Sequence, residues 1–246
     1  MKDITYTLYH GSRDGLNGDI IPESNSLSDF GSAFYMGSNP YQVQSSSING
    51  SIPTFYIGLY DFTKLDKNKI LVLDGDIWLY AIIAYKNLDK EFAKSEFATT
   101  LVKNLNKFDL LIGDIADDNM FSVFNGFSYY GSITNIAVLK CFTMIKLGKQ
   151  FAAKSKYACS LFKIVGKHIL TEDEISICKK KYAKLKVNIE KRVRKIFFET
   201  SDGLTFNKFI DVMHKPNLAN DLICKQQDKT PALLDEILAN DITRIF

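Results

Sequence analysis

The sequence contains few of the residues that build metal centres or disulfide frameworks. It has four cysteines and three histidines among 246 residues, and no CxxC pair. A zinc site needs clustered Cys and His ligands, and a small secreted scaffold needs closely spaced cysteines. We therefore assign no metal ligands and expect the cysteines to be reduced thiols packed on helix faces.

Long apolar segments are also absent. The sequence has no run of about 18 apolar residues, which is roughly the length that a membrane-spanning helix needs. The first residues, MKDITYTLYHGS, carry Asp3 where a secretory signal requires an apolar core. We therefore predict a cytoplasmic protein with no membrane partner. Its 46% hydrophobic residues are sufficient for a sizeable buried core.

The formal net charge of +3 conceals an uneven distribution of charge along the chain. Residues 1–139 hold 10 Lys and Arg against 16 Asp and Glu, whereas residues 140–195 hold 16 against 4. Residues 196–246 are again acidic, with 5 against 8. A local basic block is typical of a surface that binds phosphate groups, although the solvated face of an ordinary helix has the same composition.

The hydrophobic pattern predicts an α+β fold. Apolar residues at helical spacing predict helices that follow Asp76, Ala116 and either Ser132 or Thr134. The segment SNPYQVQSS predicts a short helix begun by Ser38, with a proline in its first turn. Short apolar and aromatic runs predict strands at 5–11, 33–37, 54–62, 69–75, 108–113 and 149–154.

The last part of the chain has a different pattern. Thr171 and Glu174 form a capping box, and a long amphipathic helix is expected to follow, with an apolar stripe that ends at Ile196 and lysines on its opposite side. Two or three shorter helices are expected after it. We therefore divide the chain into a region of residues 1–170 and a helical extension of residues 171–246, basic in its first half.

Three short motifs carry the most specific signal. They are LYHGS at 8–12, DFGSAFYMGSNPYQVQ at 29–44 and LGKQFAAKSKYA at 147–158. The segments KILVLDGDIWLYAIIAYKN and FDLLIGDIADDNMF lie between them. Together these segments resemble the DUF3990 family of the ADP-ribosyltransferase superfamily, over roughly residues 5–165.

The resemblance implies an ADP-ribosyltransferase-like split antiparallel sheet flanked by helices, and a catalytic triad of His10, Tyr35 and Gln150. It implies that His10 holds a hydroxyl of the NAD adenosine ribose, that the backbone of Gly11 pairs with the nicotinamide amide, and that Tyr35 stacks on the nicotinamide ring. Each residue also has a structural alternative, since a histidine after a strand, a core tyrosine and a strand-capping glutamine are all ordinary features. The order of the three motifs favours the functional interpretation.

Further NAD contacts are expected within the same motifs, at Ser12 and Phe30. Arg13 is a candidate partner for the NAD pyrophosphate, because a guanidinium fork suits phosphate oxygens. A solvated loop charge is the alternative interpretation of Arg13.

The third triad position departs from many transferases of the superfamily, which have Glu there. The amide of Gln150 can hydrogen-bond but cannot take a proton. Asp117 and Asp118, in the segment IADDN, are therefore the candidates for a base. Acids that stabilise a helix N-terminus have the same spacing.

The expected function is that of an NAD-dependent mono-ADP-ribosyltransferase, a glycosyltransferase that uses NAD as substrate and no metal. The basic block favours a nucleic-acid base, RNA in particular, as acceptor, and the candidate contacts are Lys179, Lys180, Lys184, Arg192 and Lys195. The alternatives are a protein side chain as acceptor, and a non-catalytic module that binds NAD or a partner. Relatives are commonly encoded beside small partner proteins and act as toxins, so a cognate antitoxin and a block of growth or phage propagation are also expected.

Overall fold

The strands and helices largely follow the apolar pattern of the sequence. The computed structural model describes residues 5–24, 27–116, 121–144, 147–187 and 189–245. The strands are β1 Thr5–Ser12, β2 Phe34–Gly37, β3 Thr54–Tyr60, β4 Ile70–Val72, β5 Leu110–Asp114, β6 Lys149–Ala153, β7 Phe162–Ile169 and β8 Thr243–Ile245. The α-helices are α1 Pro40–Ser47, α2 Gly75–Tyr85, α3 Lys90–Lys94, α4 Glu96–Leu105, α5 Phe121–Tyr129, α6 Asn135–Phe142, α7 Lys156–Ser160, α8 Glu172–Lys186, α9 Ile189–Glu199, α10 Phe206–Ile210 and α11 Leu218–Asn240.

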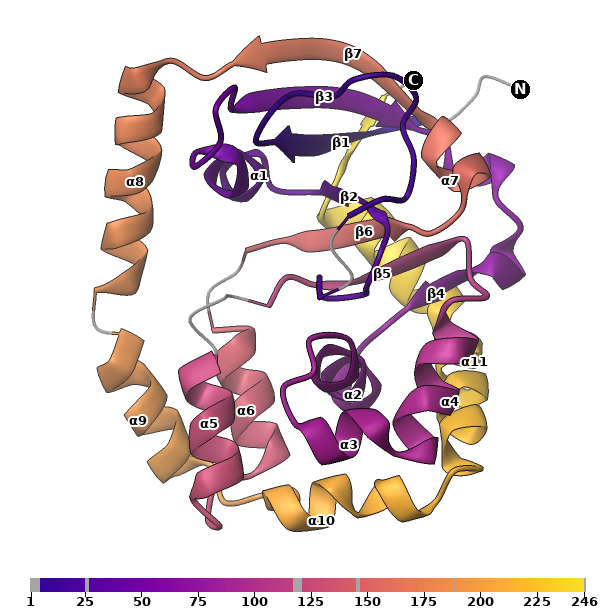
Figure 1. Ribbon diagram of the computed structural model, residues 1–246, viewed down its shortest axis with the longest axis vertical. Coiled ribbons are helices and arrows are strands. Elements are labelled where there is room, and N and C mark those ends of the chain that lie inside the picture. Colours follow the sequence, from indigo (N-terminus) through magenta and orange to yellow (C-terminus); the bar gives the residue numbers. More distant parts are fainter. Residues whose placement is uncertain (1–4, 25–26, 117–120, 145–146, 188, 246) are drawn as a thin grey trace.

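The strands form one sheet in the order β4-β5-β6-β2-β1-β3-β7, and β8 adds to β1 beside this path (Figure 1). The pair β4–β5 is parallel and the other pairs are antiparallel. Helices connect most of the strands. The predicted α+β class is therefore confirmed.

The pairing between neighbouring strands of the sheet is shortest between β1 and β2. These two strands, both fully described, share the single paired position Tyr9 with Gly37, whereas β1 pairs with β3 from Tyr6 through Ser12. On the other side, β2 pairs with β6 along its whole length. The sheet therefore consists of a β4-β5-β6-β2 half and a β1-β3-β7 half joined at one position.

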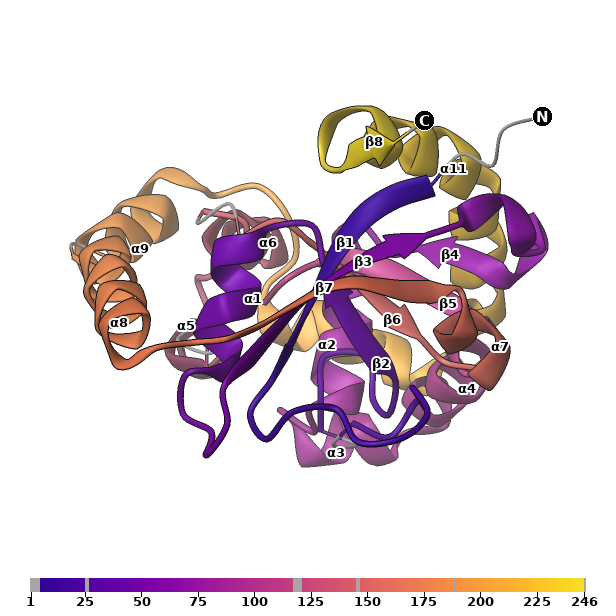
Figure 2. The ribbon, with the colours of Figure 1, turned by 90° about the horizontal axis from the view of Figure 1, so that it is seen from above.

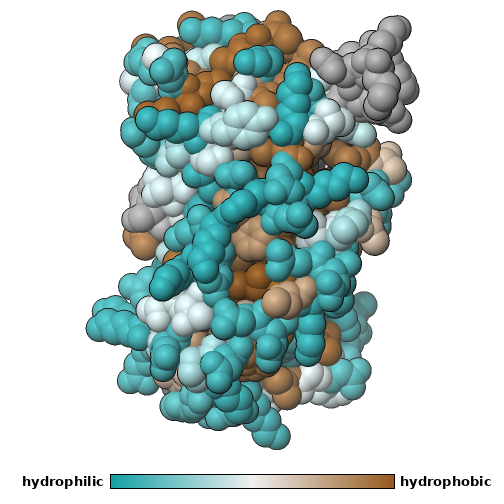
Figure 3. Space-filling model, turned by 90° about the vertical axis from the view of Figure 1, so that its right-hand side faces the viewer, coloured by the Kyte–Doolittle hydropathy of each residue, from teal (hydrophilic) through white to brown (hydrophobic). Residues whose placement is uncertain are grey.

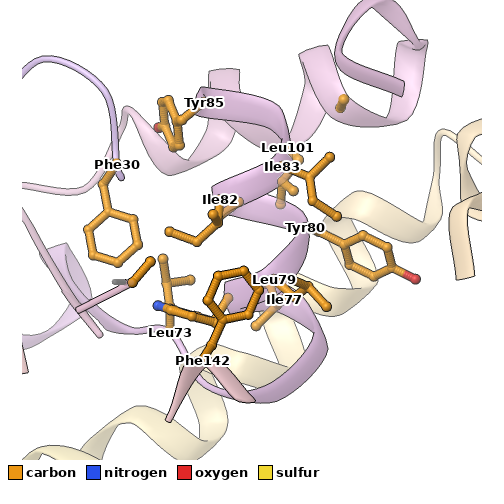
Figure 4. Packing of buried hydrophobic residues seen from close by; sticks show 14 of the residues in the cluster. Phe30, Leu73, Ile77, Leu79, Tyr80, Ile82, Ile83, Tyr85, Leu101 and Phe142 are labelled. Atoms are coloured by element: carbon orange, nitrogen blue, oxygen red, sulfur yellow. The ribbon is translucent and has the colours of Figure 1, made fainter. Parts of the chain in front are cut away.

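Alternating residues of the first half enter two separate cores, as the period of a strand requires. Leu71, Leu111 and Ala152 join the larger cluster, which helices α2 to α6 and α10 cover. Leu110 and Ala153 join the second cluster, which contains residues of α7 and the last turns of α11. Figure 4 shows how the apolar side chains of α2 fill the larger cluster, in contact with residues from several other segments.

The C-terminal residues belong to the same cores. Ile223 of α11 is buried in the larger cluster, and Ile237 is buried in the second. The side chain of Gln226 donates to the carbonyl of Val72 at 2.6 Å, and the N–H of Val72 donates to Thr230 at 3.2 Å. Helix α11 thus satisfies the backbone at the free edge of β4. The predicted division at residue 170 stays a prediction.

Of three local predictions about helix starts, one needs correction, one is refined and one is confirmed. The cap of α1 is Asn39, which accepts from the N–H of Tyr41. Ser38 instead accepts from the N–H of Lys149 at 2.9 Å. Thr134 is the cap of α6, which settles the choice between Ser132 and Thr134. The capping box at Thr171 is confirmed.

The predicted long helix after residue 171 is divided into α8 and α9 (Figure 2). Helix α8 ends at Val187, which has extended backbone angles. The break allows the apolar stripe to meet two surfaces. Ile175 of α8 packs with Val43 of α1, while Val193 and Ile196 of α9 pack against the larger core cluster.

Strand β7 was not predicted from the sequence. It lies at the edge of the sheet, and most of its residues are exposed on both faces, so they lack the alternation of a half-buried strand. Ile164 and Val165 of this strand are exposed. Strand β7 lies at the top of the molecule in Figure 1, and Figure 3 shows hydrophobic residues at that end.

The structure assigns the four cysteines as free thiols, of which Cys224 is exposed and the others are buried. Within the described residues, no helix combines the length and the apolar composition that crossing a bilayer requires.

Candidate functional site

His10 lies on β1 just beyond the joint of the two half-sheets. Its Nδ1 lies 2.7 Å from the carbonyl oxygen of Tyr35, and its ring stacks on Phe34 at a centroid distance of 4.3 Å. A carbonyl can only accept, so Nδ1 carries the hydrogen and Nε2 is left as an acceptor. Burial lowers the pKa of His10 to about 4. The side chain is therefore neutral at pH 7.

Tyr35 lies on β2, facing the larger core cluster, and is half-buried. Its hydroxyl accepts from the N–H of Phe30 at 2.9 Å and donates to the carbonyl of Gly31 at 2.8 Å. Burial raises the pKa of the phenol, which is neutral at any physiological pH. The hydroxyl thus serves to fix the ring against the loop before β2.

His10 and Tyr35 meet through the backbone of β2. The register places Tyr35 and Ala152 on one face of the sheet and Phe34 on the other. Because His10 stacks on Phe34, its ring lies on the face opposite to the phenol ring. The hydrogen bond to the carbonyl of Tyr35 joins the two half-sheets at this point.

Gln150 is buried at the start of β6, next to Gly37 on β2. Its amide nitrogen donates to Oδ2 of Asp29 at 2.7 Å and to the carbonyl of Asp114 at 3.0 Å. The other oxygen of Asp29 pairs with Nζ of Lys86 at 2.8 Å. Gln150 therefore acts as a hydrogen-bond donor to a buried carboxylate.

Asp29 and Lys86 were not among the predicted site residues. Asp29 opens the motif DFGSAFYMG, and a charged residue before an apolar and aromatic run was the available signal. Its partners, by contrast, come from α2 and β6 and are distant in sequence. Only the fold brings this carboxylate, this ammonium group and Gln150 together.

A second lysine holds the same loop. Nζ of Lys154 donates to the carbonyl of Phe30 at 2.6 Å and lies 5.0 Å from the centre of the Tyr85 ring. Burial lowers the pKa of Lys154 to about 8. The loop that positions Tyr35 is thus anchored by the phenol, by Lys154 and by the ion pair of Asp29.

The other predicted NAD contacts lie in different environments. Gly11 is packed beneath α1, because a Cβ at this position would collide with the carbonyl oxygen of Val43. The hydroxyl of Ser12 donates to the carbonyl of Gly15, and Arg13 is exposed. The ring of Phe30 is fully buried. Figure 4 shows it among the side chains of the larger core cluster. These four assignments stay predictions.

Asp117 and Asp118 lie outside the described residues. The nearest described acid of that segment is Asp114, which pairs with Nζ of Lys149 at 2.8 Å. The pair lies at the ends of β5 and β6, directly beside Gln150 in sequence and in space.

A cavity of about 430 Å³ opens next to this ion pair. Apolar residues from β4, α6 and α11 form part of its wall. Its charged lining residues are Asp74, Asp114, Glu236, Asp241 and Lys149. Acids therefore outnumber the single lysine, which does not suit a pyrophosphate. Within the described chain, no three His, Cys, Asp or Glu side chains converge as a metal site requires.

The predicted nucleic-acid contacts form an exposed basic surface along α8 and α9, at the left edge of the molecule in Figure 1. Arg192 donates to the carbonyl of Met144 at 3.2 Å, and Nζ of Lys195 lies 3.8 Å from Oε1 of Glu199. The other predicted contacts on this surface, Lys179, Lys180 and Lys184, are exposed on α8.

Helix α1 lies between this basic surface and the joint of the sheet, where Tyr9 pairs with Gly37. Val43 of α1 lies over both Gly11 and Gly37, because a Cβ on either glycine would collide with it. The same residue packs in a small cluster with Ile175 of α8. Helix α1 therefore separates His10 and its neighbours from the lysines of α8.

The searches of curated proteins and of solved structures found no match. A comparison with protein-family models matched residues 6–164 to the family described as "Protein of unknown function (DUF3990)". The match includes β1, β2 and β6, which carry His10, Tyr35 and Gln150, and most of the sheet. Since it extends over more than half of the sequence, the chain belongs to the DUF3990 family.

Proposed function

We propose that the protein binds NAD at the joint between β1 and β2 and transfers its ADP-ribose to an acceptor. The observation that carries the proposal is the hydrogen bond from neutral His10 to the backbone of Tyr35, directly beside the single paired position, Tyr9 with Gly37, that joins the two half-sheets. Both side chains keep part of their surface exposed. The split antiparallel sheet is also what the resemblance to ADP-ribosyltransferases implies.

In the proposed reaction, these residues position the cofactor and do not react with it. Breaking the bond between nicotinamide and ribose builds positive charge on the ribose carbon. Neutral His10 offers Nε2 to a ribose hydroxyl, and Tyr35 offers a ring face to nicotinamide, while its hydroxyl is held by the loop. Neither group adds a positive charge that would oppose the developing one.

Asp29 and Gln150 act together in the proposed site. The carboxylate already accepts from Gln150 and pairs with Lys86, so the three side chains form a fixed polar group next to β2. We infer that this group holds the reacting geometry, which is a positioning role. The base that activates an acceptor is not assigned to Gln150, because an amide takes no proton.

The proposed acceptor is a nucleic-acid base, with RNA favoured. The basic surface of α8 and α9 supports this choice, because phosphate groups bind where cations gather. Its position one helix from the joint would bring a bound strand close to the reacting group. A base amine can attack if it is well positioned, without a dedicated carboxylate.

A protein side chain is the second candidate acceptor. The cavity beside Lys149 and Asp114 supports it, because its carboxylates suit a cationic group such as guanidinium better than phosphate. The proposed role as a toxin with a cognate antitoxin is compatible with either acceptor and rests on the family resemblance.

Incubation with labelled NAD tests the activity and the acceptor together. The purified protein is mixed with RNA, DNA or cell lysate protein, and the label is followed into each fraction. We expect label in RNA from the wild type and a loss of at least about 100-fold in Tyr35→Ala, since a positioning contact can contribute that factor. Expression of the wild type, but not of the variant, should stop growth.

Tyr35→Phe is the matched control. It keeps the ring face and loses the hydrogen bonds to the loop, so it should retain more transfer than Tyr35→Ala. Thermal unfolding of each variant checks that the fold is kept. Label in protein alone would move the acceptor to the second candidate, and equal transfer by wild type and Tyr35→Ala would refute catalysis at this joint.

A further inference from the structure

One large aromatic side chain on the basic surface is almost completely exposed. Phe198 of α9 has 93% of its surface accessible. Lys191, Arg194 and Lys195 precede it by seven, four and three residues. Residues at these spacings lie on one side of a helix. Phe198 and three cations therefore share one exposed strip.

The exposure of Phe198 does not result from a poorly docked helix. The opposite side of α9 packs Val193, Ile196 and Phe197 against the larger core cluster. Phe197 also lies against α5, because a Cβ on Gly126 would be 3.4 Å from its ring. With α9 fixed in this way, the ring of Phe198 has to point away from the protein. A single exposed apolar residue needs no explanation by itself, but an exposed aromatic ring flanked by three cations is the combination that binds single-stranded nucleic acid.

Two further exposed aromatic residues lie at the end of α5. Tyr129 is 83% exposed and Tyr130 is 58% exposed, and their rings meet edge to face at 5.3 Å. They follow Gly126 by about one helical turn, and Gly126 is the point where α5 meets Phe197. The exposed aromatic residues therefore come from α9 and from α5, which meet where Phe197 lies against Gly126 (Figure 1).

The charge around these rings indicates the kind of partner. From Ile175 to Phe198 the chain has nine Lys and Arg and one acid, Glu190. A surface that combines cations with exposed aromatic rings suits a strand whose phosphates contact the cations while its unpaired bases stack on the rings. A duplex would keep its bases stacked on one another and leave the rings without a partner.

We propose that Phe198, with Tyr129 and Tyr130, is a stacking site for the bases of single-stranded nucleic acid. The site is distinct from the joint of the sheet and deepens the choice of acceptor, so it rests on the proposed function. It defines the substrate as an unpaired strand, held by stacking on α9 and α5 and by the cations of the basic surface.

Fluorescence anisotropy without NAD tests the site directly. The probe is a labelled single-stranded oligouridine of about 12 nucleotides, within the range that such grooves cover. Phe198→Ala should weaken binding by about fivefold or more, which is the lower range for the loss of one stacked base. Phe198→Leu should weaken it equally, because leucine keeps apolar area and loses the π face. A duplex of the same length should bind more weakly than the single strand and should not respond to Phe198→Ala.

Tyr157→Ala is the control variant. Tyr157 is also exposed, at 53%, but lies on α7, and its substitution should leave oligouridine binding unchanged. Phe198→Ala with wild-type affinity would overturn the stacking site, and full retention in Phe198→Leu would show that the patch docks an apolar surface instead. Tyr35→Ala should bind the probe normally. Binding that depends on Phe198 without any transfer of label would refute the proposed function and keep the stacking site.

Discussion

At the residue scale, burial decides what His10 can contribute. The imidazole has a carbonyl on one nitrogen and an aromatic ring against its face. Its pKa of about 4 lies below the ordinary value of 6.5, because burial penalises the charged form. Protonation therefore opposes the contact that joins the half-sheets.

This shift predicts a pH dependence of stability. The folded protein binds the His10 proton less readily than the unfolded chain does, so the free energy of unfolding is highest above pH 6.5 and falls between pH 6.5 and about 4. Urea unfolding of the wild type and of His10→Asn across this range measures the effect. The amide of Asn can donate to the carbonyl of Tyr35 and does not titrate. The difference between the two proteins should shrink as the pH falls, and parallel curves would contradict the assignment.

The residue scale also separates what the sequence can predict from what it cannot. His10, Tyr35 and Gln150 were predicted through motifs, and the structure places them on three strands around one joint. The network around Gln150 could not be predicted, because Asp29 is 121 positions away and its role depends on a strand register. Lys86 and Lys154, the two lysines that hold the loop, belong to no recognisable motif in the sequence. Their contacts with the loop exist only because the fold buries them beside it.

At the element scale, local sequence patterns predict where helices begin, whereas tertiary contacts determine where the predicted long helix after Thr171 is interrupted. The capping box at Thr171 uses side chains three residues apart and was visible in the sequence. The end of α8 was not, because the continuous apolar stripe gave no sign that it serves two docking surfaces. Strand β7 was missed for a related reason, since an exposed edge strand needs no regular apolar pattern.

The contact of α11 with β4 gives a prediction at this scale. Gln226 is buried and donates to the carbonyl of Val72, at an edge where β4 has no further strand in the described sheet. Gln226→Leu leaves that carbonyl without its donor, and we expect a loss of about 1–3 kcal/mol in the free energy of unfolding. Gln227→Leu, at the half-buried neighbouring position, should cost less than the substitution of Gln226. Denaturant unfolding compares the two, and equal losses would show that the helix edge contact is not what stabilises β4.

At the scale of the whole molecule, the chain closes on itself around the proposed site. Strand β8, close to the end of the chain, pairs with β1, the strand that carries His10. Helix α11 reaches both core clusters on its way to that strand. The residues after 170 are therefore in direct contact with the region that the family model matches.

Removal of residues 218–246 is the corresponding test. It takes Ile223 and Ile237 out of the two cores, frees the edge of β4 and removes β8, one of the strands that pair with β1. We expect the shortened chain to lose its cooperative thermal transition, because the buried apolar area lost from both cores exceeds what a marginally stable domain can spare. The control replaces Lys179, Lys180 and Lys184 by Gln, exposed positions at which substitutions usually change stability by about 0.5 kcal/mol or less. If the shortened chain instead unfolds sharply with a wild-type near-ultraviolet circular dichroism spectrum, the first 217 residues fold alone. The part of the predicted extension from residue 218 onward would then be an appendage, and the contacts of α11 would serve the site rather than the fold.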